Sequence, residues 1–272
     1  MRRYTNSLAL AGLWFAAGST LLFLAVLLGY ILYKGLPTAL SLEFIFTAPR
    51  GITMEGGIFP TIVASIYLTA LAAVFSAPVG IGAAIYLVEY AKAGRLVNLI
   101  RFGADSLASV PSIVFGLFGL ALFVYVLGFG WSMLSGGLTL AIMILPILMR
   151  TTEEAIRAVP DSYRQASFAL SATKWQTVRG VVLPAAMPRI VTGVILSIGR
   201  AFGETAAVIY TAGLAVNIPI LPTEPGRTMT THLYLLATEG VSLEAAYGTA
   251  VLLLVIILVF NWTARRYFKK MK

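Results

Sequence analysis

An arginine and a glutamate lie four residues apart in the otherwise apolar stretch "SIGRAFGETAAV", residues 197–208. In a helix, this spacing places Arg200 and Glu204 on one face. Both charges are costly when they face lipid, so we expect them to face protein or a water-filled path. A guanidinium donates two parallel hydrogen bonds to oxyanion oxygens, which predicts that Arg200 meets an anionic substrate such as phosphate. The alternative is a structural salt bridge, within the helix or between helices, that locks two subunits together.

Other polar side chains could line the same path. Glu204 should repel a bare anion, so we expect it to orient Arg200 or to pair with a cation on a partner. A hydroxyl on Thr205 could contribute, although a helical threonine often bonds back to its own backbone. The serines of "SVPS" could line the path or only stabilise a proline kink. The predicted pathway residues are Arg200, Glu204, Thr205, Ser109 and Ser112.

The composition indicates that these helices lie in a lipid bilayer. The 272 residues are 59% hydrophobic and 11% charged, with a mean hydropathy of +0.89. Several apolar runs reach the roughly 18 to 20 residues that cross about 30 Å of hydrocarbon as a helix. The first run is too long for a secretory signal and is interpreted as a retained helix. We therefore predict an all-α, polytopic membrane protein with six spans, near residues 8–33, 59–88, 104–127, 131–149, 190–212 and 245–264.

The positive charge follows this topology. With a cytoplasmic N-terminus, 16 of the 20 Lys and Arg fall in segments on the inner side. The positive-inside rule then predicts a multi-pass protein of the cytoplasmic (inner) membrane with both termini in the cytoplasm. The net charge of +9 is thereby explained without nucleic acid. The absence of cysteine excludes disulfides and thiolate metal sites.

The longest inner segment, residues 150–189, has two short helical patterns. Asp161 or Ser162 can cap the first, and Thr173 can cap a second that ends before Pro184. Their apolar side chains are Tyr163, Ala166, Phe168, Leu170, Trp175, Val178 and Val182. An apolar surface outside the bilayer predicts a docking site for a cytoplasmic protein. A hairpin that packs on its own membrane domain is the alternative.

The stretch "YRQASFALSATKWQTVRGVVLPAAMPRI" resembles the cytoplasmic coupling loop of ABC-importer permeases. The usual form is Glu-Ala-Ala, three residues, Gly, about nine residues, an apolar residue and Leu-Pro. Gln165 stands where the acidic residue is usual, and Ser171 where glycine is usual, so the turn must accept a side chain. The resemblance implies a set of ATPase-coupling residues, namely Tyr163, Arg164, Gln165, Ala166, Ser167, Ser171, Ala172, Thr173, Lys174, Trp175, Leu183 and Pro184.

A narrower resemblance covers roughly residues 50–265. "GRAFGET", "SVPSIVFGLFGL", "RTTEEAIRAVP" and "EGGIFPTIVAS" are similar to the phosphate-specific ABC permease subunits, the PstA type more than the PstC type. This implies the six-helix type I (MetI-like) importer fold. It also implies three partners besides membrane lipid: a PstC-like second permease subunit, a homodimeric PstB-like ATPase and an external PstS-like phosphate-binding protein. An N-terminal helix with its loop, residues 1–58, would precede a permease core, residues 59–272.

The function predicted is that of a permease subunit in an ATP-driven phosphate importer. No G-x-x-x-x-G-K-[ST] motif occurs, so ATP hydrolysis belongs to the partner. Catalytic motifs are absent as well, and the single histidine, His232, is expected to be an ordinary loop or short-helix residue, so we expect no enzyme, cofactor or metal. The alternatives are a permease for sulfate or molybdate, an autonomous channel or carrier with Arg200 as its filter, and an intramembrane enzyme.

Overall fold

The computed structural model describes residues 2–50, 55–92 and 94–269 and is almost entirely helical in these ranges. The first helices are α1 (Arg2–Ala39), α2 (Leu42–Phe46), α3 (Phe59–Ile85), the π-helix η1 (Tyr86–Tyr90), α4 (Arg95–Ala108), α5 (Ser112–Gly119) and the π-helix η2 (Leu120–Val126). The others are α6 (Met133–Arg157), α7 (Asp161–Ala169), α8 (Lys174–Thr177), the π-helix η3 (Val178–Val182), α9 (Leu183–Phe202), α10 (Ala206–Thr211), α11 (Met229–Thr238) and α12 (Leu243–Lys269). Strands β1 (Pro49–Arg50) and β2 (Glu55–Gly56) form one antiparallel pair.

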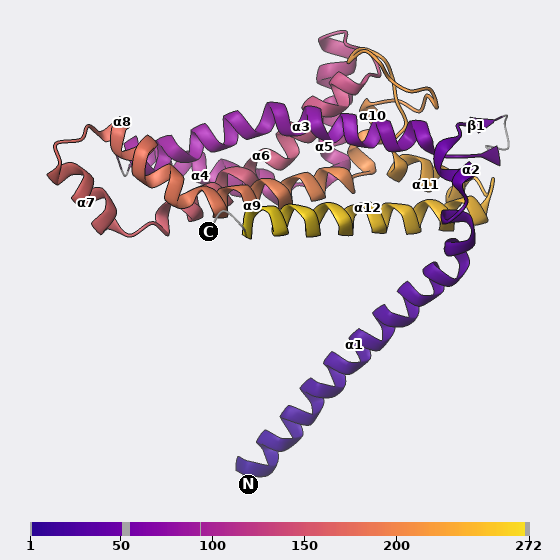
Figure 1. Ribbon diagram of the computed structural model, residues 1–272, viewed down its shortest axis with the longest axis horizontal. Helices are drawn as coiled ribbons and strands as arrows, with labels where there is room; N and C mark the ends of the chain where they lie inside the picture. Colours follow the sequence, from indigo (N-terminus) through magenta and orange to yellow (C-terminus); the bar gives the residue numbers. More distant parts are fainter. Residues whose placement is uncertain (1, 51–54, 93, 270–272) are drawn as a thin grey trace.

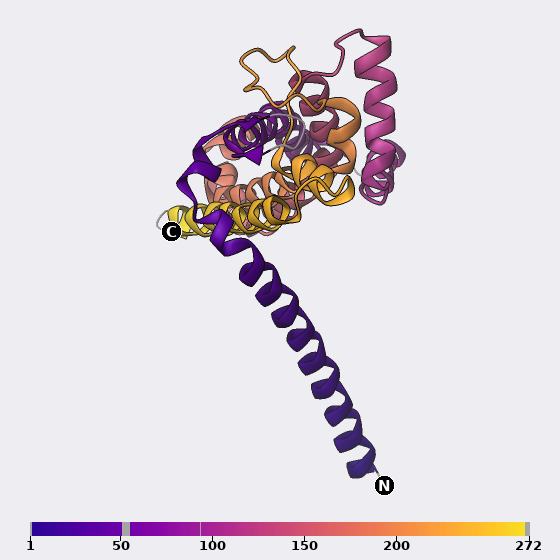
Figure 2. The same cartoon turned by 90° about the vertical axis from the view of Figure 1, so that its right-hand side faces the viewer.

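Four long helices form the body of the molecule. Helices α3, α6, α9 and α12 run side by side along the long axis, with α7 and α8 at one end and α2, β1 and α11 at the other (Figure 1). Helix α1 joins α12 near that second end, where Tyr30 packs edge-on against Tyr247 and Thr38 donates to Glu244 at 3.3 Å. Its N-terminal part diverges from the body (Figure 2), and residues 10–30 are exposed. The apolar length of α1 is therefore free to meet lipid or another chain.

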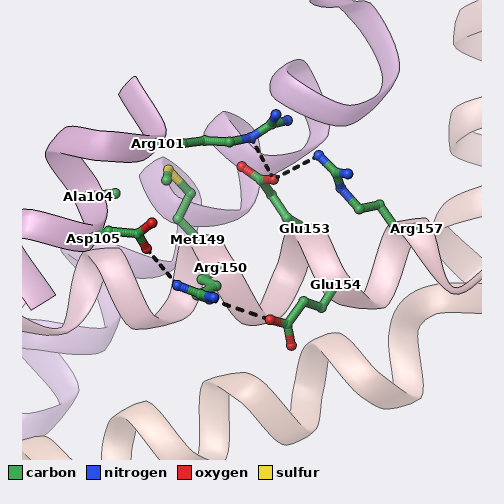
Figure 3. Close-up of a pocket in the computed structure, with 8 residues that line it drawn as sticks. All are labelled: Arg101, Ala104, Asp105, Met149, Arg150, Glu153, Glu154 and Arg157. Carbon is green, nitrogen blue, oxygen red and sulfur yellow. Dashed lines mark hydrogen bonds and ion pairs between the residues drawn. The ribbon is translucent and has the colours of Figure 1, made fainter. Parts of the chain in front are cut away.

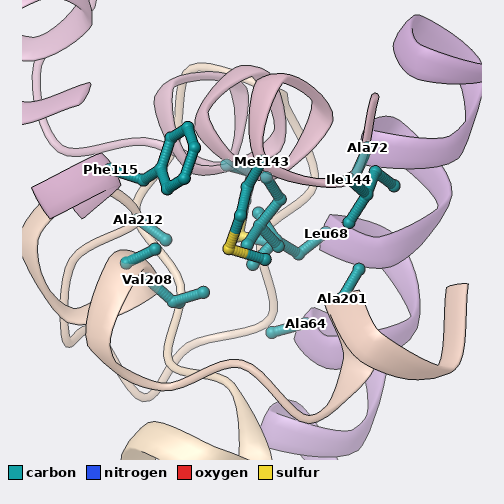
Figure 4. Packing of buried hydrophobic residues seen from close by; sticks show 12 residues of the cluster. Ala64, Leu68, Ala72, Phe115, Met143, Ile144, Ala201, Val208 and Ala212 are labelled. Atoms are coloured by element: carbon teal, nitrogen blue, oxygen red, sulfur yellow. The ribbon is translucent and has the colours of Figure 1, made fainter. Parts of the chain in front are cut away.

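The central core joins the first halves of α3 and α6 to the end of α9. Leu68 of α3, Met143 and Ile144 of α6, and Ala201 of α9 belong to one buried cluster (Figure 4). Small residues allow the close approach that membrane helices need, as where Gly136 lies against the side chain of Leu68. Phe202 lines one pocket with Ile256, which is midway along α12, so Ala201 at the end of α9 lies at the middle depth of the bundle.

Among the described residues, five helices are long and apolar enough to span a membrane, and six if one bent pair counts as a span. The bent pair is α4 with α5–η2, which meet at 101° where Pro111 precedes α5. The predicted span at 104–127 is therefore not one continuous helix, and the proline kink expected at "SVPS" is confirmed. Proline lacks an N–H and disfavours helix in the residue before it, which explains the place of the bend.

The predicted span at 190–212 is also wrong in its continuity. Helix α9 ends at Phe202, and α10 begins at Ala206. At its other end, the helix is longer than predicted, since α8, η3 and α9 form one span from Lys174 to Phe202. Pro184 does not end the second coupling helix; it occupies the first turn of α9, directly after η3. The shift to π-helical hydrogen bonds before Pro184 removes the need for its missing N–H donor.

Candidate functional site

The break between α9 and α10 gives Glu204 a role that differs from the predicted one. Glu204 Oε1 accepts hydrogen bonds from the backbone N–H of Ala206 at 3.1 Å and of Ala207 at 3.5 Å. The carboxylate thereby satisfies N–H groups that have no partner within α10. The expectation that Arg200 and Glu204 share one helical face is wrong, because the helix ends between them.

Arg200 lies in the last turn of α9 and is exposed. Within the described part of the chain, its guanidinium makes no hydrogen bond or ion pair. The next residue, Ala201, is packed at the middle depth of the bundle. A permanent charge at this depth requires a partner protein, water or a ligand. The place of Arg200 in the substrate pathway stays a prediction, and the structure shows that its side chain is exposed on this chain.

Several predicted pathway residues gather at the break. Gly116 of α5 lies so close to Ala206 and Ala207 that a Cβ would come within 2.9 Å of their backbone. Ser112 is one turn before Gly116 on the same side of α5. Thr205 is half-buried and precedes α10 at the N-cap position, where the side chain of Glu204 and not its own hydroxyl accepts from the first N–H groups. Ser112 and Thr205 are therefore brought to the break.

Ser109 lies in the bend between α4 and α5. It is exposed, and its hydroxyl donates to the carbonyl of Ser106 at 2.7 Å. Ser109 therefore closes the last turn of α4, as a kink-stabilising residue does, and its place in the substrate pathway stays a prediction.

A group of buried polar residues beside the break was not predicted from the sequence. Thr230 Oγ1 donates to the backbone carbonyl of Glu204 at 2.8 Å, and the N–H of Met229 donates to Ser65 Oγ at 2.8 Å. Arg227, also buried, donates from Nε to the carbonyl of Leu214 at 2.9 Å. The only signal was the cluster of hydroxyls in "RTMTTH". These bonds fix α11 against α3 and the broken helix.

His232 is 1% exposed, and its Nδ1 has no hydrogen-bond partner among the described residues. His232 thus lies in a short helix, as expected, but its burial was not predicted. Burial, and then the charge of Arg227, lowers the pKa of His232 from its ordinary 6.5 to about 4. His232 is therefore neutral in the folded chain at neutral pH.

This shift predicts a loss of stability in acid. The unfolded chain binds the proton near pH 6.5 and the folded chain near pH 4, so stability is complete above pH 6.5 and falls as the pH drops towards 4. At roughly 1.4 kcal/mol per pKa unit, the loss reaches about 3 kcal/mol over this window. Thermal unfolding in detergent at several pH values would measure it. The same acid sensitivity in His232→Gln would refute the assignment.

The other end of the bundle carries the predicted coupling loop. Thr173 and Gln176 form a capping box at α8, as the sequence predicted for Thr173. Helix α7 spans Asp161–Ala169 as expected, but Pro160 is at its N-cap and neither Asp161 nor Ser162 caps it. Ser171 has a φ of 60°, the left-handed conformation that glycine adopts most easily. The turn between the two helices therefore accepts a side chain in a conformation that favours glycine.

Four large apolar side chains of this loop are exposed and define what we call the docking surface. They are Tyr163 (51% exposed), Phe168 (47%), Leu170 (85%) and Trp175 (58%). Val178 and Val182 were expected beside them but are buried, with Val182 packed against the ends of α6 and α9. Their position fits the alternative in which part of the hairpin packs on its own membrane domain, and the docking surface is what remains uncovered.

The remaining predicted coupling residues surround that surface. The exposed ones are Gln165, Ala166, Ser171, Thr173, Lys174 and Pro184, and the half-buried ones are Arg164, Ala172 and Leu183. Ser167 is buried, and its hydroxyl lies 2.9 Å from that of Thr177. This hydroxyl pair holds α7 against the end of α8.

A charged pocket with a volume of about 330 Å³ lies between α4 and α6 (Figure 3). Glu153 Oε2 accepts from Arg101 Nε at 3.2 Å and from Arg157 Nη2 at 3.4 Å. Arg150 reaches Asp105 on α4 at 2.6 Å. The sequence showed the i, i+4 charges in "RTTEEAIRAVP" but not their partners on α4. These pairs fix α4 to the same end of α6 that leads into the coupling loop.

Known proteins similar to this chain are transporter permeases. Residues 76–272 match the family described as "Binding-protein-dependent transport system inner membrane component". The "Probable ABC transporter permease protein YqgI" of Bacillus subtilis (strain 168) is 35% identical over 280 residues, which cover 97% of this chain and 95% of the relative. The "Phosphate transport system permease protein PstA 1" of Mycobacterium tuberculosis (strain CDC 1551 / Oshkosh) is 35% identical over 273 residues, covering 97% and 88%.

The fold is likewise that of a known transporter. A chain of the inward-facing MetNI methionine ABC transporter superposes with a TM-score of 0.67 at 18% identity, covering 79% of this chain and 96% of that one. This similarity confirms the predicted all-α, MetI-like permease fold. Because the family match spans most of the chain, this multi-pass membrane protein belongs to the binding-protein-dependent transport system inner membrane components.

Proposed function

We propose that this chain is a permease subunit of an ATP-driven phosphate importer. Relatives that cover nearly the whole chain are phosphate transport system permease proteins of the PstA type. Its own chemistry agrees with a tetrahedral oxyanion as cargo, since an arginine fork pairs with two oxygens of a phosphate at once.

The observation that carries the proposal is the position of Arg200. It lies beside an interrupted helix, at the middle depth of the bundle, and is unpaired among the described residues. Irregular backbone within a membrane is tolerated where it is buried in protein or lines a cavity. An anion that enters this region would meet a guanidinium that no internal carboxylate neutralises, because Glu204 caps α10.

Three partners complete the proposed importer. A second permease subunit would cover the exposed side of Arg200 and supply the rest of the path. An ATPase dimer would bind the docking surface, and a phosphate-binding protein would deliver substrate at the end that carries α2, β1 and α11. This assignment places both termini in the cytoplasm and residues 59–272 in the permease core.

Each step of the transport cycle would belong to one of these subunits. ATP binding closes the ATPase dimer, and α7 and α8 transmit that closure to the membrane helices. The two permease subunits then rock against each other and expose the path to alternate sides. Arg200 binds and orients the anion, while the apolar core around Ala201 excludes other routes.

Reconstitution would test this function. The chain is assembled in liposomes with its permease partner, ATPase and binding protein, and uptake of labelled phosphate is followed with and without ATP. We expect uptake that needs both ATP and the binding protein and that persists in a large excess of sulfate. Full competition by sulfate would assign another oxyanion, and uptake without the ATPase would indicate an autonomous carrier.

A further inference from the structure

Helix α7 is attached to the rest of the molecule through few side chains. Seven of its nine residues are exposed; the two that are not are Arg164, which is half-buried, and Ser167, which is buried. Ser167 pairs with Thr177 and so joins α7 to the start of the α8–η3–α9 span. Arg164 is the residue of α7 whose side chain bonds to the other helices of the body, α3–η1 and α6.

Arg164 points away from the docking surface and into the bundle. Its Nη2 and Nε donate to Glu89 Oε1 at 2.7 and 3.1 Å. The same guanidinium donates to the backbone carbonyls of Val159 at 2.9 Å and Ile156 at 3.1 Å, at the end of α6. The side chains of Arg164 and Glu89 are 15% and 8% exposed. One guanidinium thus joins α7 to both α3–η1 and α6.

A second contact connects the same two regions. Lys174, the first residue of α8, lies with its ammonium 5.3 Å from the centre of the Tyr90 ring. Tyr90 follows Glu89 at the end of η1, the π-helical continuation of α3. Adjacent residues of η1 therefore hold α7 and α8 separately. We call these two contacts the η1 joint: Glu89–Arg164 and Tyr90–Lys174.

The apolar packing under the loop cannot replace this joint. Val159, Val182 and Ile190 form a buried cluster, against which Ile85 and Val88 of the α3–η1 region pack. Hydrophobic contacts of this kind are not directional, so they permit sliding and rotation. An ion pair with two N–H donors on one carboxylate oxygen, inside a mostly buried site, fixes distance and angle together.

We propose that Arg164 is a positioning residue that couples ATP hydrolysis to transport through Glu89, and not a contact to the ATPase. Motion imposed on α7 at the docking surface would be passed through this ion pair to the inner end of α3, whose other half packs around Ala201 beside Arg200. π-Helical turns are frequent at functional sites, and η1 carries both residues of the joint that contact α7 and α8. The inference rests on the proposed function, since it specifies how that importer transmits force.

The test uses the full complex in liposomes and measures phosphate taken up per ATP hydrolysed. Glu89→Gln keeps the side-chain size and removes the charge, and we expect it to lower this ratio roughly tenfold or more, because it leaves Arg164 without its buried partner. ATPase binding, judged by co-purification, should remain, since no residue of the docking surface changes. Arg164→Lys should also lower the phosphate taken up per ATP, because an ammonium cannot bond to the carboxylate and two carbonyls with the same geometry.

Asp161→Asn is the matched control. Asp161 also pairs with Arg164, at 3.0 Å, but its side chain is 86% exposed. An exposed pair contributes little, so the coupling ratio should stay as in the unchanged protein. If Glu89→Gln prevents assembly, the exchange Glu89→Arg with Arg164→Glu is examined instead; restored assembly with a coupling ratio several times that of either single variant would support the joint.

Two results would overturn the inference. One is a normal coupling ratio in Glu89→Gln; the other is a charge-exchanged double variant that is no better coupled than the single variants. Both differ from failure of the proposed function, in which the unchanged complex would itself show no ATP-dependent phosphate uptake. A stability change alone would leave phosphate moved per ATP unaltered, so the ratio separates positioning from folding.

Discussion

Arg200→Gln is expected to abolish ATP-driven phosphate uptake while the complex still assembles. Glutamine cannot donate two charge-assisted hydrogen bonds to an oxyanion, and each such bond contributes about 1.5 to 3 kcal/mol. A loss of about 3 kcal/mol or more corresponds to a reduction of roughly a hundredfold. Assembly should persist, because Arg200 is exposed and makes no hydrogen bond or ion pair within the described chain that would hold α9 in place. Initial rates of labelled phosphate uptake in liposomes would measure the effect.

Two variants make this experiment specific. Arg200→Lys keeps the charge and loses the planar fork, so we expect partial uptake with weaker discrimination against sulfate. Arg95→Gln removes an exposed arginine at the start of α4, far along the chain from the break, and should leave uptake unchanged. Normal transport by Arg200→Gln would show that this arginine is structural. An unassembled complex would instead favour the subunit-locking salt bridge that the sequence also allowed.

The features that the sequence predicted well are those that depend on local patterns. Long apolar runs gave the membrane class and the α-helical fold, because a bilayer admits few other structures. The N-cap at Thr173 was predicted, since a cap depends on residues close in sequence, and the structure adds the reciprocal bond to Gln176. The coupling loop was found through a motif that combines such local signals. The motif also marked Ser171 as standing where glycine is usual, and the structure shows that this residue has the left-handed backbone that glycine adopts most easily.

The features that the sequence did not predict depend on competition between distant groups. Glu204 had a cation four residues before it and two backbone N–H groups after it, and the structure pairs it with the N–H groups. Nothing in the spacing decides between these partners, because the outcome depends on where α9 ends. The ion pair of Arg164 with Glu89 joins residues 75 positions apart, so no local pattern could indicate it. His232 was likewise unremarkable in sequence and is buried only because α11 folds back against α3.

Trp175→Ala should separate the ATPase from the permease. Trp175 is 58% exposed on the docking surface, where a large aromatic side chain outside the membrane has no partner within the described chain that covers it. Truncation of such an anchor typically costs about 2 to 4 kcal/mol of binding free energy, which is roughly a thirtyfold to thousandfold weaker complex. The fold should be unaffected, because the buried side of this hairpin is formed by Val178 and Val182. Binding of purified ATPase to the permease in detergent would give the ratio of the dissociation constants of the variant and the unchanged protein.

The comparison that makes this result decisive uses Tyr234→Ala at the opposite end of the molecule. Tyr234 is 48% exposed on α11, so it matches Trp175 in chemistry and exposure but not in location. We expect this variant to bind the ATPase normally. Leu170→Asp, at the most exposed position of the docking surface, should weaken binding as Trp175→Ala does, because it places a charge in an apolar contact. If ATPase binding survived in both docking-surface variants, α7 and α8 would not be the attachment site, and the apolar hairpin would serve only its own membrane domain.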